Sequence, residues 1–179
     1  MTLRVFLLSF WLALGLASAD DLGLGRQSAV TFQAPQPSPV YRGAPGRVEL
    51  QFRVASGFHI NSNQPKQEYL RKTELKLDPP ADIAIEKIGY PPGQDQSFAF
   101  APDEKLSVYS GAFQISVMVR PPDSVSPTKY MIRGQLRYQA CDKAACYPPK
   151  NLPVEFEIKV TKGTRVHRAN PAQSPDINR

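Results

Sequence analysis

The sequence predicts an all-β fold built as an antiparallel β-sandwich, on three observations. Apolar and polar residues alternate with a two-residue period in a series of segments, which is typical of strands with one buried and one solvated face. Proline pairs separate these segments, and proline ends strands because it lacks a backbone N–H donor. No segment carries a convincing helical stripe. The expected topology is immunoglobulin-like, without the core tryptophan and inter-sheet cysteines of antibody domains.

The predicted strands follow one another through the middle of the chain. Their alternating apolar sets are Val48, Leu50, Phe52 and Val54; Leu75 and Leu77; Ile83, Ile85 and Ile88, more loosely spaced; Phe113, Ile115, Val117 and Val119; Tyr130, Ile132, Leu136 and Tyr138; and Val154, Phe156, Ile158 and Val160. The proline pairs between them lie at 79–80, 91–92, 121–122 and 148–149. Gly134 interrupts the fifth set, so we expect a β-bulge there.

Residues 1–19 have the features of a cleaved export signal. A short basic start leads into an apolar run over residues 5–16, and Ala17-Ser18-Ala19 then supplies the small side chains that a signal peptidase accepts. The run is short for a bilayer-spanning helix, which disfavours the alternative of an uncleaved membrane anchor. The mature chain is expected to begin at Asp20 and to be exported from the cytoplasm.

A single folded domain is expected over residues 46–160. Residues 20–45 are rich in Pro, Gly, Gln and Ser and are interpreted as an extended lead-in rather than a core element. Residues 161–179 contain few apolar side chains and are interpreted as a disordered basic tail. The formal net charge is +6, but the basic tail has no interleaved aromatic residues, which argues against nucleic-acid binding.

Cys141 and Cys146 are the chain's 2 cysteines, and in an oxidising compartment such a pair normally forms a disulfide. Closing a loop of about six residues stabilises a fold by about 2 kcal/mol, against about 5 kcal/mol for a loop of about a hundred residues. A disulfide between near neighbours in the sequence therefore contributes little to the stability of the fold. It is also the arrangement that thiol–disulfide exchange uses, because one thiol can attack a mixed disulfide formed by its partner.

Spacing alone leaves redox exchange and a small structural clip as open alternatives for this pair. Lys143 and Lys150 would favour a thiolate nearby, whereas Asp142 would oppose it. A third alternative joins the two cysteines to His59 and His167 as a metal site. That spacing matches no zinc pattern, and His167 lies in the expected tail, so no metal is predicted.

Residues 138–149 resemble the active-site segment of a known family. The family comprises the N-terminal periplasmic domain of the thiol:disulfide interchange protein DsbD, also described as a disulfide bond corrector, DsbC-like domain. Its pattern is Tyr-Gln-x-Cys, a short insert and Cys-x-Pro-Pro, which this chain reproduces as Tyr-Gln-Ala-Cys at 138–141 and Cys-Tyr-Pro-Pro at 146–149. Two supporting matches are Gly-Phe-His-Ile-Asn-Ser-Asn at 57–63 and Val-Tyr-Ser-Gly at 108–111.

The resemblance implies an immunoglobulin-like domain that carries electrons in the periplasm. A membrane-embedded thiol electron transporter would reduce it, and that transporter would be a separate chain because this one stops after the sandwich. The reduced pair would then reduce thioredoxin-like periplasmic proteins, so the implied activity is that of a protein-disulfide reductase component.

The resemblance makes Cys146 the attacking thiol and Cys141 the resolving one. No cofactor is implied, since the sulfur atoms hold the electrons. The alternative is a non-catalytic exported binding or assembly module with a structural disulfide.

Such domains also carry an aromatic cap over the cysteine pair until a partner docks. Phe98 and Phe100, in the Gly-, Pro- and Gln-rich stretch 93–105, are the candidates for this cap. The surface that meets a partner is expected to include Phe58, Ile60 and Tyr147. His59 is expected to face solvent, with tuning of a thiolate as the alternative.

Overall fold

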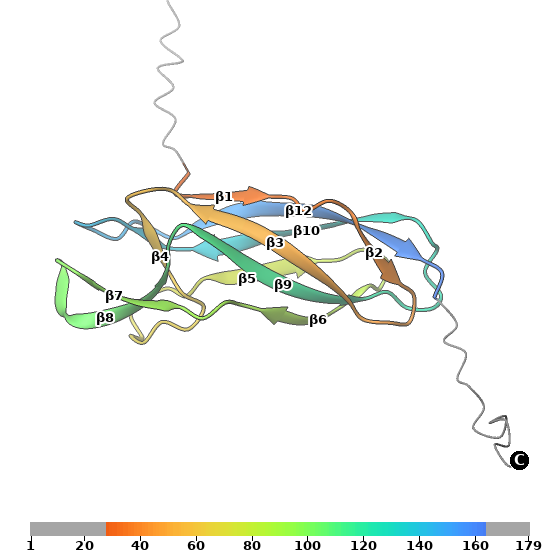
Figure 1. Cartoon of the computed structure of the whole chain (residues 1–179), viewed down its shortest axis with the longest axis horizontal. Helices are drawn as coiled ribbons and strands as arrows, with labels where there is room; N and C mark the ends of the chain where they lie inside the picture. The colour runs from red at the N-terminus through yellow and green to blue at the C-terminus, as the bar shows by residue number, and fades with distance from the viewer. Residues whose placement is uncertain (1–27, 164–179) are drawn as a thin grey trace, which may run out of the picture.

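The computed structural model describes residues 28–163, which form an all-β, immunoglobulin-like sandwich (Figure 1). The expected signal peptide, the start of the lead-in and residues 164–179 of the tail lie outside this range. Within residues 28–163, no helix is long and apolar enough to cross a membrane. The predicted fold class is confirmed.

Three small sheets make up the fold. The first contains, in order, β1 (Val30–Gln33), β3 (Gly46–Val54), β9 (Ala112–Arg120) and β6 (Ala84–Gly89). The second contains β2 (Ser38–Tyr41), β12 (Lys150–Thr161), β10 (Lys129–Tyr138) and β5 (Glu74–Asp78). The third contains β11 (Ala140–Cys141), β4 (His59–Asn61), β8 (Ala101–Tyr109) and β7 (Gln94–Phe98). Neighbours pair antiparallel throughout, except that β2 runs parallel to β12.

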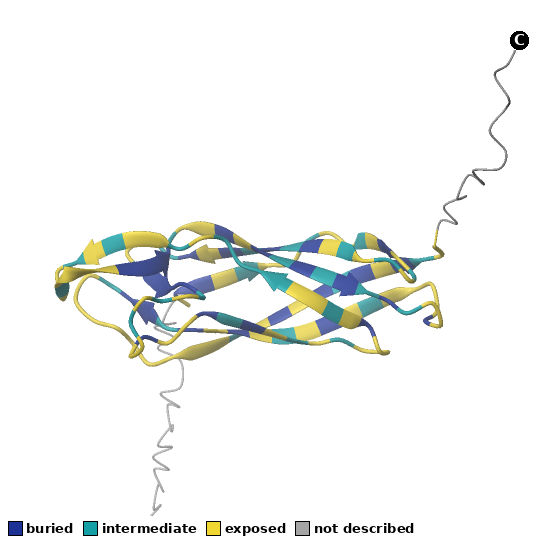
Figure 2. Ribbon diagram, turned by 90° about the horizontal axis from the view of Figure 1, so that it is seen from below, coloured by how far each residue is buried: buried dark blue, intermediate teal, exposed yellow. Residues whose placement is uncertain are grey.

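The core lies between the first two sheets and consists of the alternating residues that the sequence marks. Buried and exposed residues alternate along the strands in Figure 2, as expected for a sandwich with solvated outer faces. Fully buried members from the two sheets include Leu50, Ile115, Val117, Ile132, Leu136 and Ile158. The strands predicted around these residues are β3, β9, β10 and β12, and all four are confirmed.

The expectation that residues 20–45 contain no core element is wrong. Val30 in β1 is 0% exposed and Val40 in β2 is 1% exposed, and both belong to the main core cluster. The proline-rich stretch between these strands carries the chain from the first sheet to the second. Each of these short strands has a single buried residue, so its sequence shows no two-residue period. The interpretation of residues 20–45 therefore depended on their prolines.

Strand pairing is irregular along β6 and regular at Gly134. The pairing of β6 with β9 shifts register between Ile85 and Lys87, and this bulge explains why the apolar spacing along β6 is loose. Gly134, by contrast, pairs without a register shift on both sides, so the bulge predicted there is wrong. A Cβ at Gly134 would lie 2.1 Å from the carbonyl oxygen of Lys76. The glycine therefore permits close approach of β5 to β10.

The third sheet extends one end of the sandwich. In Figure 1, β4, β7 and β8 lie at this end, and the described chain leaves at residue 163 from the opposite end. Residues 93–105, expected to form a loop, are largely the β7–β8 hairpin. The short strand β11 continues from β10 and pairs with β4, so the cysteine segment is joined to this extension.

Candidate functional site

Cys141 and Cys146 form the expected disulfide, with an S–S distance of 2.04 Å. The two residues face each other directly in an antiparallel bridge, and their Cα atoms are 3.9 Å apart. This separation is below the usual range of about 4.4–6.8 Å for a disulfide. The burial of the two cysteines differs: Cys141 is 0% exposed, whereas Cys146 belongs to the exposed residues. The pair thus has one shielded and one solvent-facing member.

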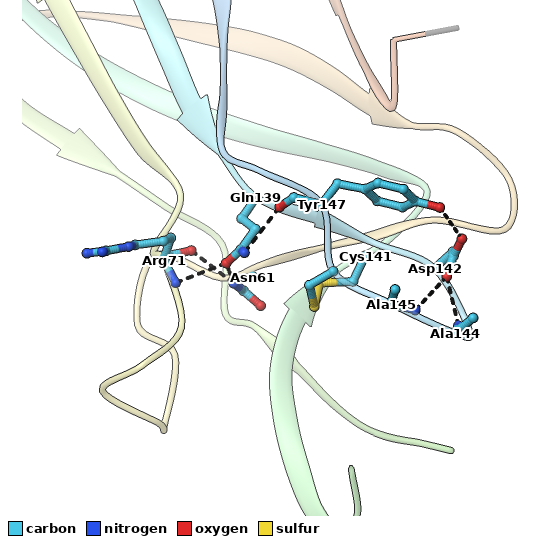
Figure 3. Close-up of a disulfide and its surroundings, with 9 residues drawn as sticks. Asn61, Arg71, Gln139, Cys141, Asp142, Ala144, Ala145 and Tyr147 are labelled. Atoms are coloured by element: carbon cyan, nitrogen blue, oxygen red, sulfur yellow. Dashed lines mark hydrogen bonds between the residues drawn. A yellow bond between two sulfur atoms is a disulfide. The ribbon is translucent and has the colours of Figure 1, made fainter. Parts of the chain in front are cut away.

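Asp142 organises the turn between the two cysteines. One of its carboxylate oxygens accepts hydrogen bonds from the backbone N–H groups of Ala144 at 2.7 Å and Ala145 at 2.9 Å. The other accepts a hydrogen bond from the hydroxyl of Tyr147 at 2.5 Å (Figure 3). Backbone hydrogen bonds also close the hairpin on both sides of the disulfide, from Asp142 to Ala145 and from Tyr147 to Ala140. The turn is therefore held by more than its covalent bond.

These hydrogen bonds lower the pKa of the Asp142 carboxyl from its ordinary value of 3.8 to about 2. The hydroxyl of Tyr147 is the largest cause, followed by the N–H groups of Ala144 and Ala145. All three donate to the ionised carboxylate and so favour the charged form. Asp142 is consequently a fixed negative charge beside the cysteine pair at neutral pH.

Gln139 ties the cysteine segment to its neighbours on both sides. Its side-chain oxygen accepts hydrogen bonds from the Asn61 amide at 3.2 Å and from the Arg71 backbone N–H at 3.3 Å. Its side-chain nitrogen donates to the carbonyl of Tyr147 at 3.2 Å (Figure 3). One side chain thus joins β4, the segment after β4 and the residue that follows Cys146.

His59 lies directly opposite Cys141 in the β4–β11 pair. The residue is 4% exposed, so the expectation that it faces solvent is wrong. Its Nε2 atom is buried and has no hydrogen-bond partner among residues 28–163. Burial lowers the pKa of the imidazole below 6.5, and the negative charge of Asp142 opposes this shift. The sequence offered no sign of this burial, because His59 belongs to a strand of only three residues.

The aromatic residues predicted as a cap are stacked on His59. The Phe98 ring lies 3.8 Å from the His59 ring, centroid to centroid, with an interplanar angle of 16°. The Phe100 ring lies 5.5 Å from Phe98 and 6.3 Å from His59, and Phe100 is 37% exposed. Phe98 also packs against a small second core cluster of Leu70, Leu106 and Val108. The two phenylalanine rings thus cover the histidine that neighbours Cys141, with Phe98 in closer contact than Phe100.

Phe58 and Tyr147 line a cavity of about 730 Å³ beside the disulfide hairpin. Its remaining lining residues are Ala29, Tyr138, Ala140, Pro148, Pro149 and Lys150. The Phe58 and Tyr147 rings are 6.1 Å apart, and Tyr147 is 41% exposed. Ile60 does not share this surface: it is 0% exposed and packs in the main core, so the prediction that it meets a partner is wrong.

The residues considered for a metal site form no metal-binding group within residues 28–163. Both cysteines are engaged in the disulfide, and His167 lies outside the described residues. Within residues 28–163, no group of three or more His, Cys, Asp or Glu side chains is arranged to hold a metal ion.

Sequence reasoning missed the polar groups that position the cysteines. Gln139 lies inside the motif at 138–141, and Asn61 lies inside the motif at 57–63. The available signal was a polar side chain next to apolar residues in each motif. Asp142 was considered only as a charge that opposes a thiolate. Aspartate side chains commonly accept hydrogen bonds from backbone N–H groups two and three residues further along the chain, as Asp142 does in this turn. That preference could have predicted the turn from the sequence.

Comparison with known proteins gives one family match. The model of the family described as thiol:disulfide interchange protein DsbD, N-terminal, matches residues 27–158. No curated protein matches the chain at a significant level.

Several solved structures are similar to the chain. The reduced DsbD N-terminal domain of Neisseria meningitidis is 24% identical, with 62% of this chain and 74% of that chain covered and a TM-score of 0.38. A complex between the DsbD N-terminal and PilB N-terminal domains of Neisseria meningitidis gives 20% identity, coverage of 61% and 73%, and a TM-score of 0.38. The SrpA adhesin of Streptococcus sanguinis gives 14% identity, coverage of 75% and 56%, and a TM-score of 0.36.

Proposed function

The chain belongs to the DsbD N-terminal family of thiol:disulfide interchange proteins, and from this membership we propose that it exchanges thiols and disulfides through Cys141 and Cys146. In the proposed reaction Cys146 attacks a disulfide of another protein, and Cys141 then attacks the sulfur of Cys146 and releases that protein. The domain ends with its own disulfide, and the partner ends with two thiols.

The unequal burial of the two cysteines is the observation that carries this proposal. A thiol must be reached before it can attack, and Cys146 is exposed while Cys141 is 0% exposed. The resolving thiol needs no access from outside, because the Cα atoms of the pair are only 3.9 Å apart. The assignment of Cys146 as attacking thiol and Cys141 as resolving thiol therefore agrees with the burial of each residue.

The proposal extends to compartment and partners. The signal-like residues 1–19 support a periplasmic location, where oxidised thiol proteins with a thioredoxin-like fold are the proposed acceptors of electrons. A membrane-embedded thiol electron transporter is the proposed donor. Phe58 and Tyr147, on the wall of the cavity beside the hairpin, are proposed to contact these partners. Phe98 and Phe100 are proposed as the cap.

Trapping a mixed disulfide tests the exchange directly. In a Cys141→Ala protein the attacking thiol has no resolving partner, so incubation with an oxidised thioredoxin-like protein should give a stable, reductant-sensitive adduct through Cys146. The matched Cys146→Ala protein should give no adduct, because its remaining thiol is buried. Equal trapping by both variants, or trapping by neither, would contradict the proposal.

A redox titration separates exchange from a structural clip. Inert structural disulfides have potentials below about −300 mV, whereas exchanging pairs lie above that value. We expect the Cys141–Cys146 pair to titrate in the higher range. A potential below it, together with resistance to thioredoxin-like reductants, would favour the non-catalytic binding module.

A further inference from the structure

The proposed exchange does not explain why the side chain of His59 is buried. The imidazole is 4% exposed, and its Nε2 atom has no hydrogen-bond partner among residues 28–163. A buried polar atom without a partner costs free energy, so such atoms are rare and call for a reason. In the disulfide form described here, neither sulfur carries a proton that could satisfy a nitrogen acceptor. A reduced cysteine beside His59 would carry one.

The strand register places Cys141 at that position. His59 and Cys141 are directly opposed in the antiparallel β4–β11 pair. Opposed residues project to the same face of a sheet, with Cβ atoms about 4.5–5.5 Å apart. The next pair along, Ile60 with Ala140, projects to the other face and joins the main core. His59 and Cys141 thus share one face.

The surroundings of His59 separate its side chain from water, since the residue is only 4% exposed. Phe98 stacks on the imidazole at 3.8 Å, and Phe100 lies beside Phe98, 5.5 Å from it and 6.3 Å from the imidazole. These rings, contributed by the β7–β8 hairpin, do not ionise. From β11 and the turn that follows it come Cys141 and Asp142, and the charge of Asp142 acts on the imidazole. The imidazole therefore has one reactive neighbour and one negative charge nearby.

We propose that Nε2 of His59 accepts the proton of the Cys141 thiol during the resolving step. This inference rests on the proposed exchange and assigns a proton acceptor to its second half. Residues of the cysteine motif alone would not indicate it, since His59 lies more than eighty positions earlier in the chain.

The step balances as follows. After Cys146 has attacked a protein disulfide, it is bonded to one sulfur of that partner, and Cys141 remains a thiol. The Cys141 proton moves to Nε2, and the resulting thiolate attacks the sulfur of Cys146. The Cys141–Cys146 bond forms, the bond from Cys146 to the partner breaks, and the partner's second sulfur leaves as a thiolate. That thiolate takes the proton held by the imidazolium, so two electrons and two protons in total pass to the partner.

The chemistry of a buried thiol explains why an acceptor is needed. A charged thiolate is costly to form in a buried position, so the thiol of Cys141 needs a nearby group to accept its proton. The lowered pKa of His59 keeps the imidazole neutral near pH 7 and therefore able to accept a proton. The carboxylate of Asp142 would then stabilise the imidazolium formed in the step.

A two-phase reaction with a small aromatic disulfide, dithiobis-nitrobenzoate, tests the inference. The reduced protein releases one coloured thiolate when Cys146 attacks and a second when Cys141 resolves the adduct. In His59→Phe, which keeps an aromatic ring under Phe98, the first phase should be unchanged. The second should slow by at least about tenfold at pH 7, a modest share of the effect of a typical general base.

The pH dependence distinguishes proton transfer from a structural role. In the unaltered protein the second phase should level off near neutral pH, where the imidazole is neutral. In His59→Phe and His59→Gln it should instead rise steeply into the alkaline range, following the thiol itself. His167→Phe, which alters the chain's other histidine, should leave both phases unchanged.

Each failure has a different meaning. An unchanged second phase in both His59 variants would overturn the role of His59 while leaving exchange intact. A missing first phase in the unaltered reduced protein would instead overturn the proposed exchange. A third outcome is that the first and the second phase slow by the same factor within each of the two variants, His59→Phe and His59→Gln. The histidine would then support the fold around the cysteines and accept no proton, which also overturns the inference.

Discussion

The hydroxyl of Tyr147 donates a hydrogen bond to the carboxylate of Asp142 across the turn that the Cys141–Cys146 bond closes. Asp142 follows the first cysteine and Tyr147 follows the second, so this contact spans the same loop as the disulfide. Because it does not involve the sulfurs, nothing in its chemistry requires the disulfide. We expect the contact to persist after reduction and to keep the two thiols near each other, which favours their rapid rejoining.

Removing the Tyr147 hydroxyl should raise the pKa of Asp142. The carboxyl pKa is about 2 chiefly because of this hydroxyl, so in Tyr147→Phe it should move toward 3.8 but stop short, since Ala144 and Ala145 still donate. The folded pKa lies below the unfolded one, so the stability from this charge is full above pH 3.8 and is lost as pH falls through about 2. The carbon resonance of the carboxyl, followed by NMR against pH, measures the shift.

The control for this change is Tyr69→Phe, which removes another exposed tyrosine hydroxyl bonded to a carboxylate, that of Glu104. It should leave the titration of Asp142 where it is. An Asp142 pKa that stays near 2 in Tyr147→Phe would show that the hydroxyl does not hold the carboxylate.

Replacing Gln139 by alanine should lower the free energy of unfolding by about 0.5–1.5 kcal/mol, the usual net contribution of a hydrogen bond, because only its bond to Asn61 is partly buried. The Asn61 amide and the Arg71 N–H would lose an acceptor, and the Tyr147 carbonyl a donor. Urea unfolding at constant m-value measures the change. The matched variant is Gln135→Ala in β10, whose exposed side chain makes no hydrogen bond within residues 28–163 and should change stability by less than about 0.5 kcal/mol. Similar losses in both variants would refute the role of Gln139.

Adding a methyl group at Gly134 should destabilise the second sheet. Its Cβ would lie 2.1 Å from the Lys76 carbonyl oxygen, a backbone atom that can move only if β5 moves. Overpacking of this kind costs about 1–3 kcal/mol, and Gly134→Ala should lose at least that much. Gln135→Ala again serves as the neighbouring control. Thermal unfolding of Gly134→Ala at the same temperature as the unaltered protein would disprove the close approach of β5 and β10.

The sandwich was predictable where strands are long. Val48 to Val54 and Val154 to Val160 repeat their buried residues often enough for a two-residue period to stand out. The strands around Val30, Val40 and His59 are three or four residues long, so no period can be recognised in them. Their burial arises from pairing with distant strands, which local sequence does not encode.

The candidate site was predictable only as far as its motif. Cys141, Cys146 and Tyr147 lie within one twelve-residue segment, so the sequence itself brings them together. His59 and Phe98 join them from β4 and β7, and that assembly depends on the pairing of β4 with both β11 and β8. Ile60 illustrates the same difficulty: a shift of one position along a strand reverses which face a side chain occupies. Motif proximity therefore assigned Ile60 to the surface, while the register buries it.

Phe98 and Phe100 should differ in their effects although both belong to the stack. Phe98 packs against Leu70, Leu106 and Val108, so Phe98→Ala should lower stability by about 1–3 kcal/mol. Phe100 is 37% exposed, and Phe100→Ala should lose less. If the stack acts as a cap, reduction of the disulfide by dithiothreitol should also be severalfold faster in Phe98→Ala. An unchanged reduction rate in both variants would exclude the cap role, whatever the change in stability.

Acidification should destabilise the protein through His59. Burial sets the folded pKa of this imidazole below 6.5, the value expected when the chain is unfolded and the ring is solvated. Between those two values the unfolded chain binds more protons, so stability falls as pH decreases below about 6.5, by at most about 1.4 kcal/mol per pH unit for one group. Asp142 reduces the effect because its charge favours the imidazolium. Urea unfolding between pH 5 and pH 7.5 should therefore show a slope that His59→Phe removes and His167→Phe retains. A slope of the same size in His59→Phe would mean that carboxyl groups cause it, and that the imidazole accepts protons as readily in the folded protein as in the unfolded chain.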